Sequence, residues 1–173
     1  MFPYAGLPLI LGALIIVCAN RMDGFTILLR GLIIIFGYIA AILDLKSKRI
    51  PNQLILAMLA SWVLVMTPKL FFDTAAAVGM LIDSALGFAI GGCIFLLVYI
   101  VSHKGLGGGD VKFMAAAGLY LGLKNAIPAM LYGTILAALT GLTLIILKRI
   151  NRKDKIPLAP FLYIGILITV FFQ

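Results

Sequence analysis

The chain has 173 residues, of which 64% are hydrophobic and 12% are charged, whereas an ordinary globular domain is about half apolar and about a quarter charged. A soluble domain of this size exposes too much surface to hide that excess, so lipid is expected to be the main solvent. A net charge of +8 is often a sign of nucleic-acid binding, but basic cytoplasmic loops explain it in a membrane protein, and we predict no nucleic-acid partner.

A spanning helix needs about 20 mostly apolar residues, and the sequence predicts an all-α, polytopic membrane bundle with about seven crossings. The expected spans are 3–20, 25–43, 53–67, 83–101, 126–148 and 157–172, together with a shorter piece at 110–122. No basic residue precedes 3–20 and no clear cleavage site follows it, so we interpret it as a retained span. The chain then divides into an extra N-terminal transmembrane helix, residues 1–24, and a six-helix membrane core, residues 25–173.

The distribution of basic residues favours seven crossings. With the short piece counted as a crossing, ten lysines and arginines fall on one side, three fall on the other, and Arg30 lies within the second span. The positive-inside rule then predicts that the ten are cytoplasmic, as is the N-terminus. The longest segment expected outside the membrane is 67–82.

Cysteine and histidine do not form a pattern typical of a metal site or a disulfide framework. Cys18 and Cys93 lie far apart in apolar runs, and His103 is the single histidine. We therefore predict no metal and no cofactor.

All six acidic residues are aspartates, and two of them stand out. Asp44 follows the apolar run 33–43, Asp110 precedes the run 111–123, and both are expected at the cytoplasmic ends of helices. Asp154 is explained as a loop charge among basic neighbours. Two carboxylates held close together cannot both ionise easily, so one activates a water while the other hydrogen-bonds a carbonyl oxygen. The plainer interpretation is that Asp44 is an interfacial charge and Asp110 a helix cap.

Glycines precede Asp110 in the run Gly105-Leu106-Gly107-Gly108-Gly109. Glycine lets another backbone approach closely, and a peptidase must hold its substrate extended beside its acids. A flexible loop is the plainer explanation. A phosphate-binding loop is excluded because no GK[ST] sequence follows.

Three segments together resemble the type IV prepilin peptidases, a family of GxGD aspartic peptidases. Gly107-Gly108-Gly109-Asp110 fits the GxGD signature and Lys112 follows it. Asp44-Leu45-Lys46-Ser47-Lys48-Arg49-Ile50-Pro51-Asn52 is similar to the segment around the family's other catalytic aspartate, and 156–162 is similar to its proline-phenylalanine motif. The resemblance covers roughly residues 28–173.

The resemblance implies an endopeptidase of the bacterial or archaeal plasma membrane whose catalytic pair is Asp44 and Asp110. Its partners would be pilin-like precursors, cut on the cytoplasmic side, and the lipid bilayer. Gly107, Gly108, Gly109 and Lys112 are candidates for substrate binding. Larger family members carry a domain with paired CxxC motifs and also N-methylate the product. Cys18 and Cys93 cannot form such motifs, so we predict a peptidase without methylation, similar to the short forms of tight-adherence and archaellum systems.

Three alternatives remain open. A presenilin-like intramembrane protease would carry a Tyr-Asp pair, whereas Leu43 precedes Asp44 here. A small transporter using the aspartates as ion relays would place them nearer the midplane and would show internal repeats. A membrane scaffold without chemistry would not depend on either aspartate.

Overall fold

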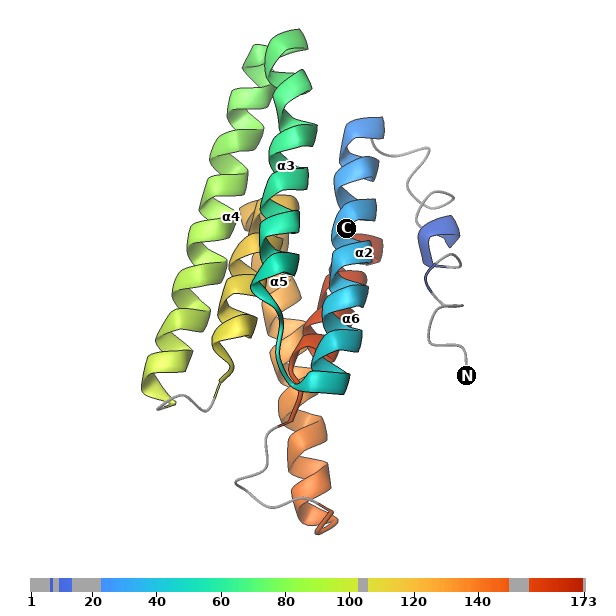
Figure 1. The fold of residues 1–173 in the computed structure, drawn as a ribbon, viewed down its shortest axis with the longest axis vertical. Helices are drawn as coiled ribbons and strands as arrows, with labels where there is room; N and C mark the ends of the chain where they lie inside the picture. Colours follow the sequence, from blue (N-terminus) through green and yellow to red (C-terminus); the bar gives the residue numbers. More distant parts are fainter. Residues whose placement is uncertain (1–6, 8–9, 14–22, 103–105, 150–155, 173) are drawn as a thin grey trace.

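The computed structural model describes residues 7, 10–13, 23–102, 106–149 and 156–172, and this part of the chain is helical with no strand (Figure 1). The named helices are α2 (Gly24–Ser47), α3 (Asn52–Phe72), α4 (Thr74–Val101), α5 (Gly108–Ile146) and α6 (Ala159–Phe172). Residues 7 and 10–13 are helical. The rest of the predicted first span, 3–20, lies outside the described residues, and so does most of the predicted N-terminal unit, residues 1–24.

Four helices, α2 to α5, are long and apolar enough to cross a membrane, and α6 is a shorter apolar helix. These helices confirm the prediction of an all-α, polytopic membrane bundle. The number of crossings stays a prediction.

The hairpin between α3 and α4 is longer than expected from the sequence. The predicted spans ended at 67 and resumed at 83, whereas α3 continues to Phe72 and α4 begins at Thr74, so that most of 67–82 is helical. Asp73 separates the two helices, and its Oδ1 accepts a hydrogen bond from the backbone N–H of Ala76 at 3.3 Å. A carboxylate here satisfies a free N–H of the first turn, which lets α4 begin immediately after α3 ends.

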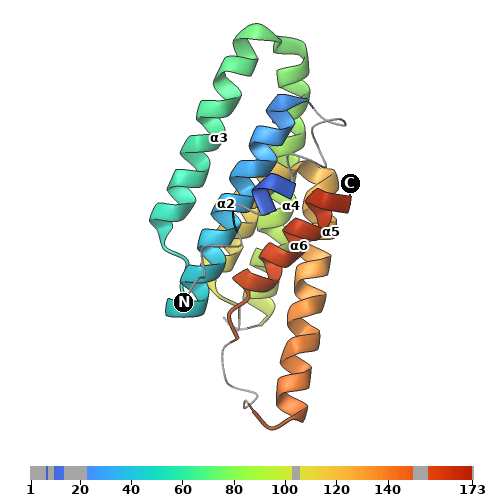
Figure 2. The ribbon, with the colours of Figure 1, turned by 90° about the vertical axis from the view of Figure 1, so that its right-hand side faces the viewer.

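Helix α5 consists of two segments that meet at Gly122, where the backbone leaves the helical region with φ 68° and ψ 175°. The first segment packs on α4, since Gly87 lies against Gly118 and Gly91 against Met114. The second segment packs on α6, since Ala129 lies against Gly165 and Gly133 against Leu162. The predicted pieces 110–122 and 126–148 are therefore two separate segments, and the second projects beyond its neighbours at one end of the bundle (Figures 1 and 2).

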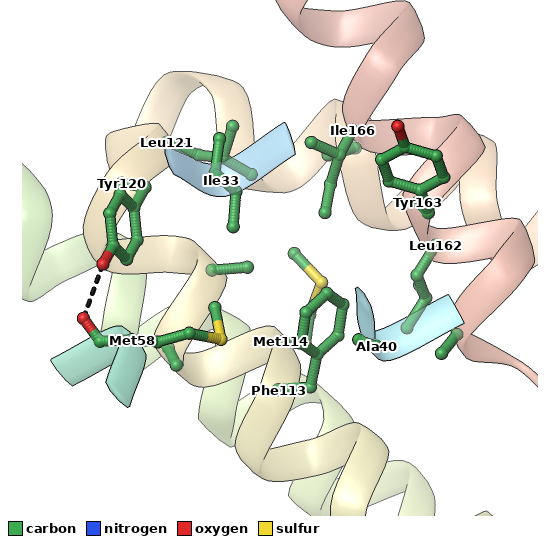
Figure 3. Close-up of a cluster of buried hydrophobic side chains, with 14 of the residues drawn as sticks. Ile33, Ala40, Met58, Phe113, Met114, Tyr120, Leu121, Leu162, Tyr163 and Ile166 are labelled. Carbon is green, nitrogen blue, oxygen red and sulfur yellow. Dashed lines mark hydrogen bonds between the residues drawn. The ribbon is translucent and has the colours of Figure 1, made fainter. Parts of the chain in front are cut away.

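The core lies where α2, α3, both segments of α5 and α6 meet. Figure 3 shows its side chains, of which the largest fully buried ones include Ile33, Met58, Phe113, Met114 and Leu162. Around this core the helices approach one another at glycines, a mode of packing typical of membrane bundles because small residues let backbones come close. The core thereby fixes α2, α5 and α6 relative to one another at the end where Asp44 and Asp110 lie.

Candidate active site

The structure brings Asp44 and Asp110 together. Asp44 lies in the last turn of α2 and Asp110 in the first turn of α5, and the two side chains are only 5% and 8% exposed. The Asp110 carboxyl interacts electrostatically with that of Asp44. Two buried carboxyls from separate helices thus share one site, although 65 residues separate them in the sequence.

Asp44 is held by the N-terminus of α6. Its Oδ2 accepts a hydrogen bond from the backbone N–H of Ala159 at 3.0 Å, and the backbone of Leu158 also favours the charged carboxylate. Lys48 contributes a favourable charge interaction. The free N–H groups at a helix start carry partial positive charge, so these partners favour the ionised form of Asp44, whereas the burial of its carboxyl opposes ionisation.

The end of α2 directs the chain from Asp44 into the next motif. Lys48 adopts a left-handed conformation with φ 51°, and its N–H donates to the carbonyl oxygen of Asp44 at 2.8 Å. The Ser47 hydroxyl bonds the carbonyl oxygens of Leu43 and Arg49 at 2.7 and 3.1 Å. This turn brings Ile50 to the start of α5, where it lies against Gly109.

The two carboxyl oxygens of Asp110 have different surroundings. Its Oδ2 lies close to the backbone of Gly107, the residue that caps α5, and this contact favours the charged carboxylate. Its Oδ1 is buried and has no hydrogen-bond partner within the described part of the chain. A carboxyl oxygen of this kind is suited to carry a proton and to bind the carbonyl oxygen of a substrate.

The three glycines before Asp110 differ in their surroundings. A Cβ on Gly107 would lie 2.7 Å from Asp110 Oδ2, so glycine is needed here to leave room for the carboxylate. A Cβ on Gly109 would lie 3.2 Å from the Cβ of Ile50, whereas one on Gly108 would meet nothing within 4 Å. Gly107 and Gly109 therefore have structural reasons to be glycine, and Gly108 is the one that leaves open space beside the site.

Lys112 joins the two motif segments. Its Nζ donates to Asn52 Oδ1 at 3.0 Å, and both side chains are exposed. Together with the contact between Gly109 and Ile50, this bond holds the segment after Asp44 against the first turn of α5. The proposed substrate contact of Lys112 thus competes with a structural role that the sequence did not indicate.

No group of three or more histidine, cysteine, aspartate or glutamate side chains is placed to hold a metal ion in the described ranges. Cys18, His103 and Asp154 lie outside those ranges, and Cys93 is exposed on α4. The candidate site is therefore a pair of carboxyls with backbone and lysine neighbours.

An apolar cleft of about 310 Å³ lies between α4 and the second segment of α5. Leu106, just before the glycines, and Leu158, next to Ala159, also line it, but Asp44 and Asp110 do not. The cleft thus borders two segments that also contact the carboxyls, the one before the glycines and the start of α6.

Sequence reasoning did not identify two groups that shape the site. The Ala159 amide belongs to a segment noted only for its prolines and phenylalanine, and a backbone N–H leaves no trace in residue identity. Asp83 did not stand out among the six aspartates, but its Oδ1 accepts from the Leu123 N–H at 3.1 Å at the start of the second segment of α5. The break in apolar sequence near Gly122 was the available signal for Asp83.

The fold and the site define a helical membrane protein with two paired, buried carboxyls. A family model described as the type IV leader peptidase family matches residues 31–142, which is most of the core, and the chain belongs to this family. This confirms the resemblance seen in the sequence.

Curated relatives carry the name prepilin leader peptidase/N-methyltransferase. The chain is 28% identical to the protein from Bacillus subtilis over 131 residues, 73% of this chain and 48% of the relative. It is 28% identical to the protein from Xanthomonas campestris over 138 residues, with 78% and 47% covered, and 32% identical to the one from Legionella pneumophila over 152 residues, with 86% and 52% covered. The chain thus spans about half the length of these relatives. No solved structure matches it.

Proposed function

We propose that this chain is a membrane aspartic endopeptidase that removes the leader peptide from type IV pilin-like precursors. The observation that carries the proposal is the buried pair of carboxyls, Asp44 and Asp110, which come from separate helices and interact electrostatically. Membership of the type IV leader peptidase family and the names of the relatives support the choice of substrate.

The surroundings of the two carboxyls suggest different roles for them. Asp44, bonded by the N-terminus of α6 and close to Lys48, is the ionised base that takes a proton from water. Asp110, with one unpartnered oxygen, holds the proton and hydrogen-bonds the scissile carbonyl. The water oxygen bonds to the carbonyl carbon, a proton then passes to the leaving nitrogen, and the C–N bond breaks.

The apolar cleft beside the site is suited to the part of the precursor that follows the scissile bond. Its lining residues are almost all apolar, and they include Leu106 and Leu158, which neighbour the segments that contact the carboxyls. A hydrophobic helix lying there would place the residues before it at the pair. The basic residues near Asp44, among them Lys46, Lys48 and Arg49, support a cytoplasmic location for this end in the plasma membrane.

The proposal covers peptide cleavage and excludes N-methylation by these 173 residues. Cys18 and Cys93 are the only cysteines in the sequence, and they are too far apart to form paired CxxC motifs. Mass spectrometry of the mature precursor's N-terminus after co-expression should show an unmodified amine. A methylated amine in cells without another methyltransferase would contradict this part of the proposal.

The test is cleavage of a pilin-like precursor co-expressed with the wild type, Asp44→Asn or Asp110→Asn, followed as a change in precursor size. Asparagine keeps the shape and hydrogen-bonding capacity of aspartate but cannot accept the proton, so each variant should lose about 100-fold or more in rate. Asp73→Asn, at an exposed aspartate that caps α4, is the matched control and should cleave normally. Wild-type cleavage by either site variant would reject the two-aspartate mechanism.

A further inference from the structure

Two helices begin beside the carboxyl pair: α5, with Asp110 in its first turn, and α6, whose first N–H bonds Asp44. The first N–H groups of a helix have no partner within it, and they carry partial positive charge. At α6 these groups are used. The N–H of Ala159 donates to Asp44, position 160 is a proline, and the next two N–H groups donate to the carbonyl oxygen of Leu158.

The first turn of α5 differs, because two of its N–H groups have no partner. The N–H groups of Asp110 and Val111 donate to the carbonyl oxygen of Gly107 at 3.1 and 3.4 Å. Those of Gly108 and Gly109 bond no group in the part of the chain that the structure describes. Two donors with partial positive charge thus remain free on the turn that carries Asp110.

Of these two residues, Gly108 is the accessible one. It is exposed, and a Cβ on it would meet nothing within 4 Å, whereas Gly109 lies against Ile50. The Gly108 nitrogen is also close to the Asp110 carboxyl. A Cβ on Gly107 would lie 2.7 Å from Oδ2, and three covalent bonds join that Cβ to the Gly108 nitrogen, so the nitrogen lies within roughly 6 Å of Oδ2. Two donors at such a separation can bond one oxygen, since each hydrogen bond spans about 3 Å.

A second observation indicates that a ligand oxygen belongs at this place. Asp110 is 8% exposed, and its Oδ1 has no hydrogen-bond partner among the described residues. A buried polar atom of this kind is normally satisfied, so the free carboxyl oxygen and the free N–H of Gly108 both await a partner beside the same turn.

We infer that the backbone N–H of Gly108 is a second donor to the scissile carbonyl oxygen, beside the proton of Asp110, an inference that rests on the proposed peptidase reaction. As the water oxygen bonds to the carbonyl carbon, Asp44 takes a proton from the water. The electron pair of the C=O double bond then moves onto the carbonyl oxygen and returns when the C–N bond breaks. Gly108 stabilises that oxygen while it carries the extra electron density, as fixed backbone donors do in acyl transfer.

The test replaces Gly108 by proline, which removes the N–H. Proline suits the first position of α5, and Gly107 already has φ −74° and ψ 133°, the extended conformation of a residue before proline. Gly108→Ala places a Cβ in the same open space but keeps the N–H, so the ratio of the two cleavage rates measures the donor. The proline variant should have a kcat about 100-fold below that of the alanine variant, with a similar KM and the same pH dependence.

Three results would overturn the inference and leave the two-aspartate mechanism in place. Equal kcat values for the proline and alanine variants would show that the N–H does not act. A loss confined to KM would mean that the N–H binds the substrate elsewhere than at the reacting carbonyl. A shifted pH dependence would mean that proline had displaced the carboxyls.

Two further measurements separate the remaining cases. Wild-type cleavage by Asp44→Asn or Asp110→Asn would instead reject the proposed function itself. If Gly108→Pro does not fold, glycolic acid in place of Gly108 replaces the N–H by an ester oxygen without a ring. That protein should show the same loss of kcat, and a wild-type kcat would overturn the inference.

Discussion

The backbone N–H of Ala159 donates to Oδ2 of Asp44 at 3.0 Å, across 115 residues of sequence. This bond joins the end of α2 to the beginning of α6. At the other end of the same helix pair, Arg30 bonds the carbonyl oxygen of Val170. Helix α6 is thus tied to α2 by a charged side chain at each end, and the tie at Ala159 also orients the proposed base.

Replacing Ala159 by proline removes the N–H that Asp44 accepts. Proline is tolerated in the first turn of a helix, so α6 should still form. A hydrogen bond to a charged group contributes about 1.5–3 kcal/mol, and its loss should slow precursor cleavage about 10- to 100-fold. Ala159→Gly keeps the N–H and is the control. Equal cleavage by the glycine and proline variants would show that the bond does not matter for the reaction.

Substitution of Gly107 by alanine should displace the Asp110 carboxylate, because the added Cβ would lie 2.7 Å from Oδ2. Misplacing a catalytic group by about 1 Å can cost about 100-fold in rate. Gly108→Ala, where the Cβ meets nothing within 4 Å, is the matched control and should cleave nearly as fast as the wild type. The comparison uses cleavage rates at equal amounts of membrane-inserted protein. Similar cleavage rates for the two variants would mean that catalysis does not depend on the observed position of the Asp110 carboxylate.

Lys112 and Asn52 form a pair whose role can be measured by a double-mutant cycle. If Lys112 acts by holding Asn52, then Lys112→Met, Asn52→Ala and the double variant should show similar cleavage rates, each lowered at most about tenfold. If Lys112 instead contacts the substrate, its effect should persist in full when Asn52 is already alanine. The structure favours the first outcome.

Gly122 should tolerate no side chain. Its φ of 68° costs an L-residue about 1–2 kcal/mol, and a Cβ would collide with the Asp83 carboxylate. Gly122→Ala should therefore lower the thermal unfolding midpoint in detergent. Gly79→Ala, at an exposed helical position with open space around the Cβ, should leave the midpoint unchanged or raise it. A Gly122→Ala protein as stable as the wild type would contradict the described turn.

The helices could be predicted from the sequence because apolar runs of spanning length are unambiguous in composition. The ends of α3 and α4 could not, because Lys69 and Asp73 resemble the start of a loop, whereas Asp73 caps α4. The apolar runs predicted separate segments on either side of Gly122, and the charge count favoured the first of them as a crossing. The left-handed backbone at Gly122, where the chain reverses direction, was not predicted, because a count of charges carries no information about backbone conformation.

The two acids of the candidate site could be predicted from the sequence, but the groups that contact them could not. Asp44 and Asp110 stood out because each borders an apolar run, and the resemblance to a family joined them. The bond from Ala159 is made by a backbone group and depends on tertiary packing of α6 on α2, which no local pattern encodes. The hydrogen bond between Lys112 and Asn52 likewise depends on the distance between the two motif segments in the folded protein.

The elbow at Gly122 has a consequence for the order in which the protein is made. The N–H of Leu123 needs a partner within the membrane, because lipid offers none, and Asp83 supplies it from α4. Since α4 precedes α5 in the chain, the carboxylate is already in place when ribosomal synthesis reaches the elbow. The first segment of α5 can then pack on α4 as soon as it is made, whereas the second segment must wait for α6, on which it packs.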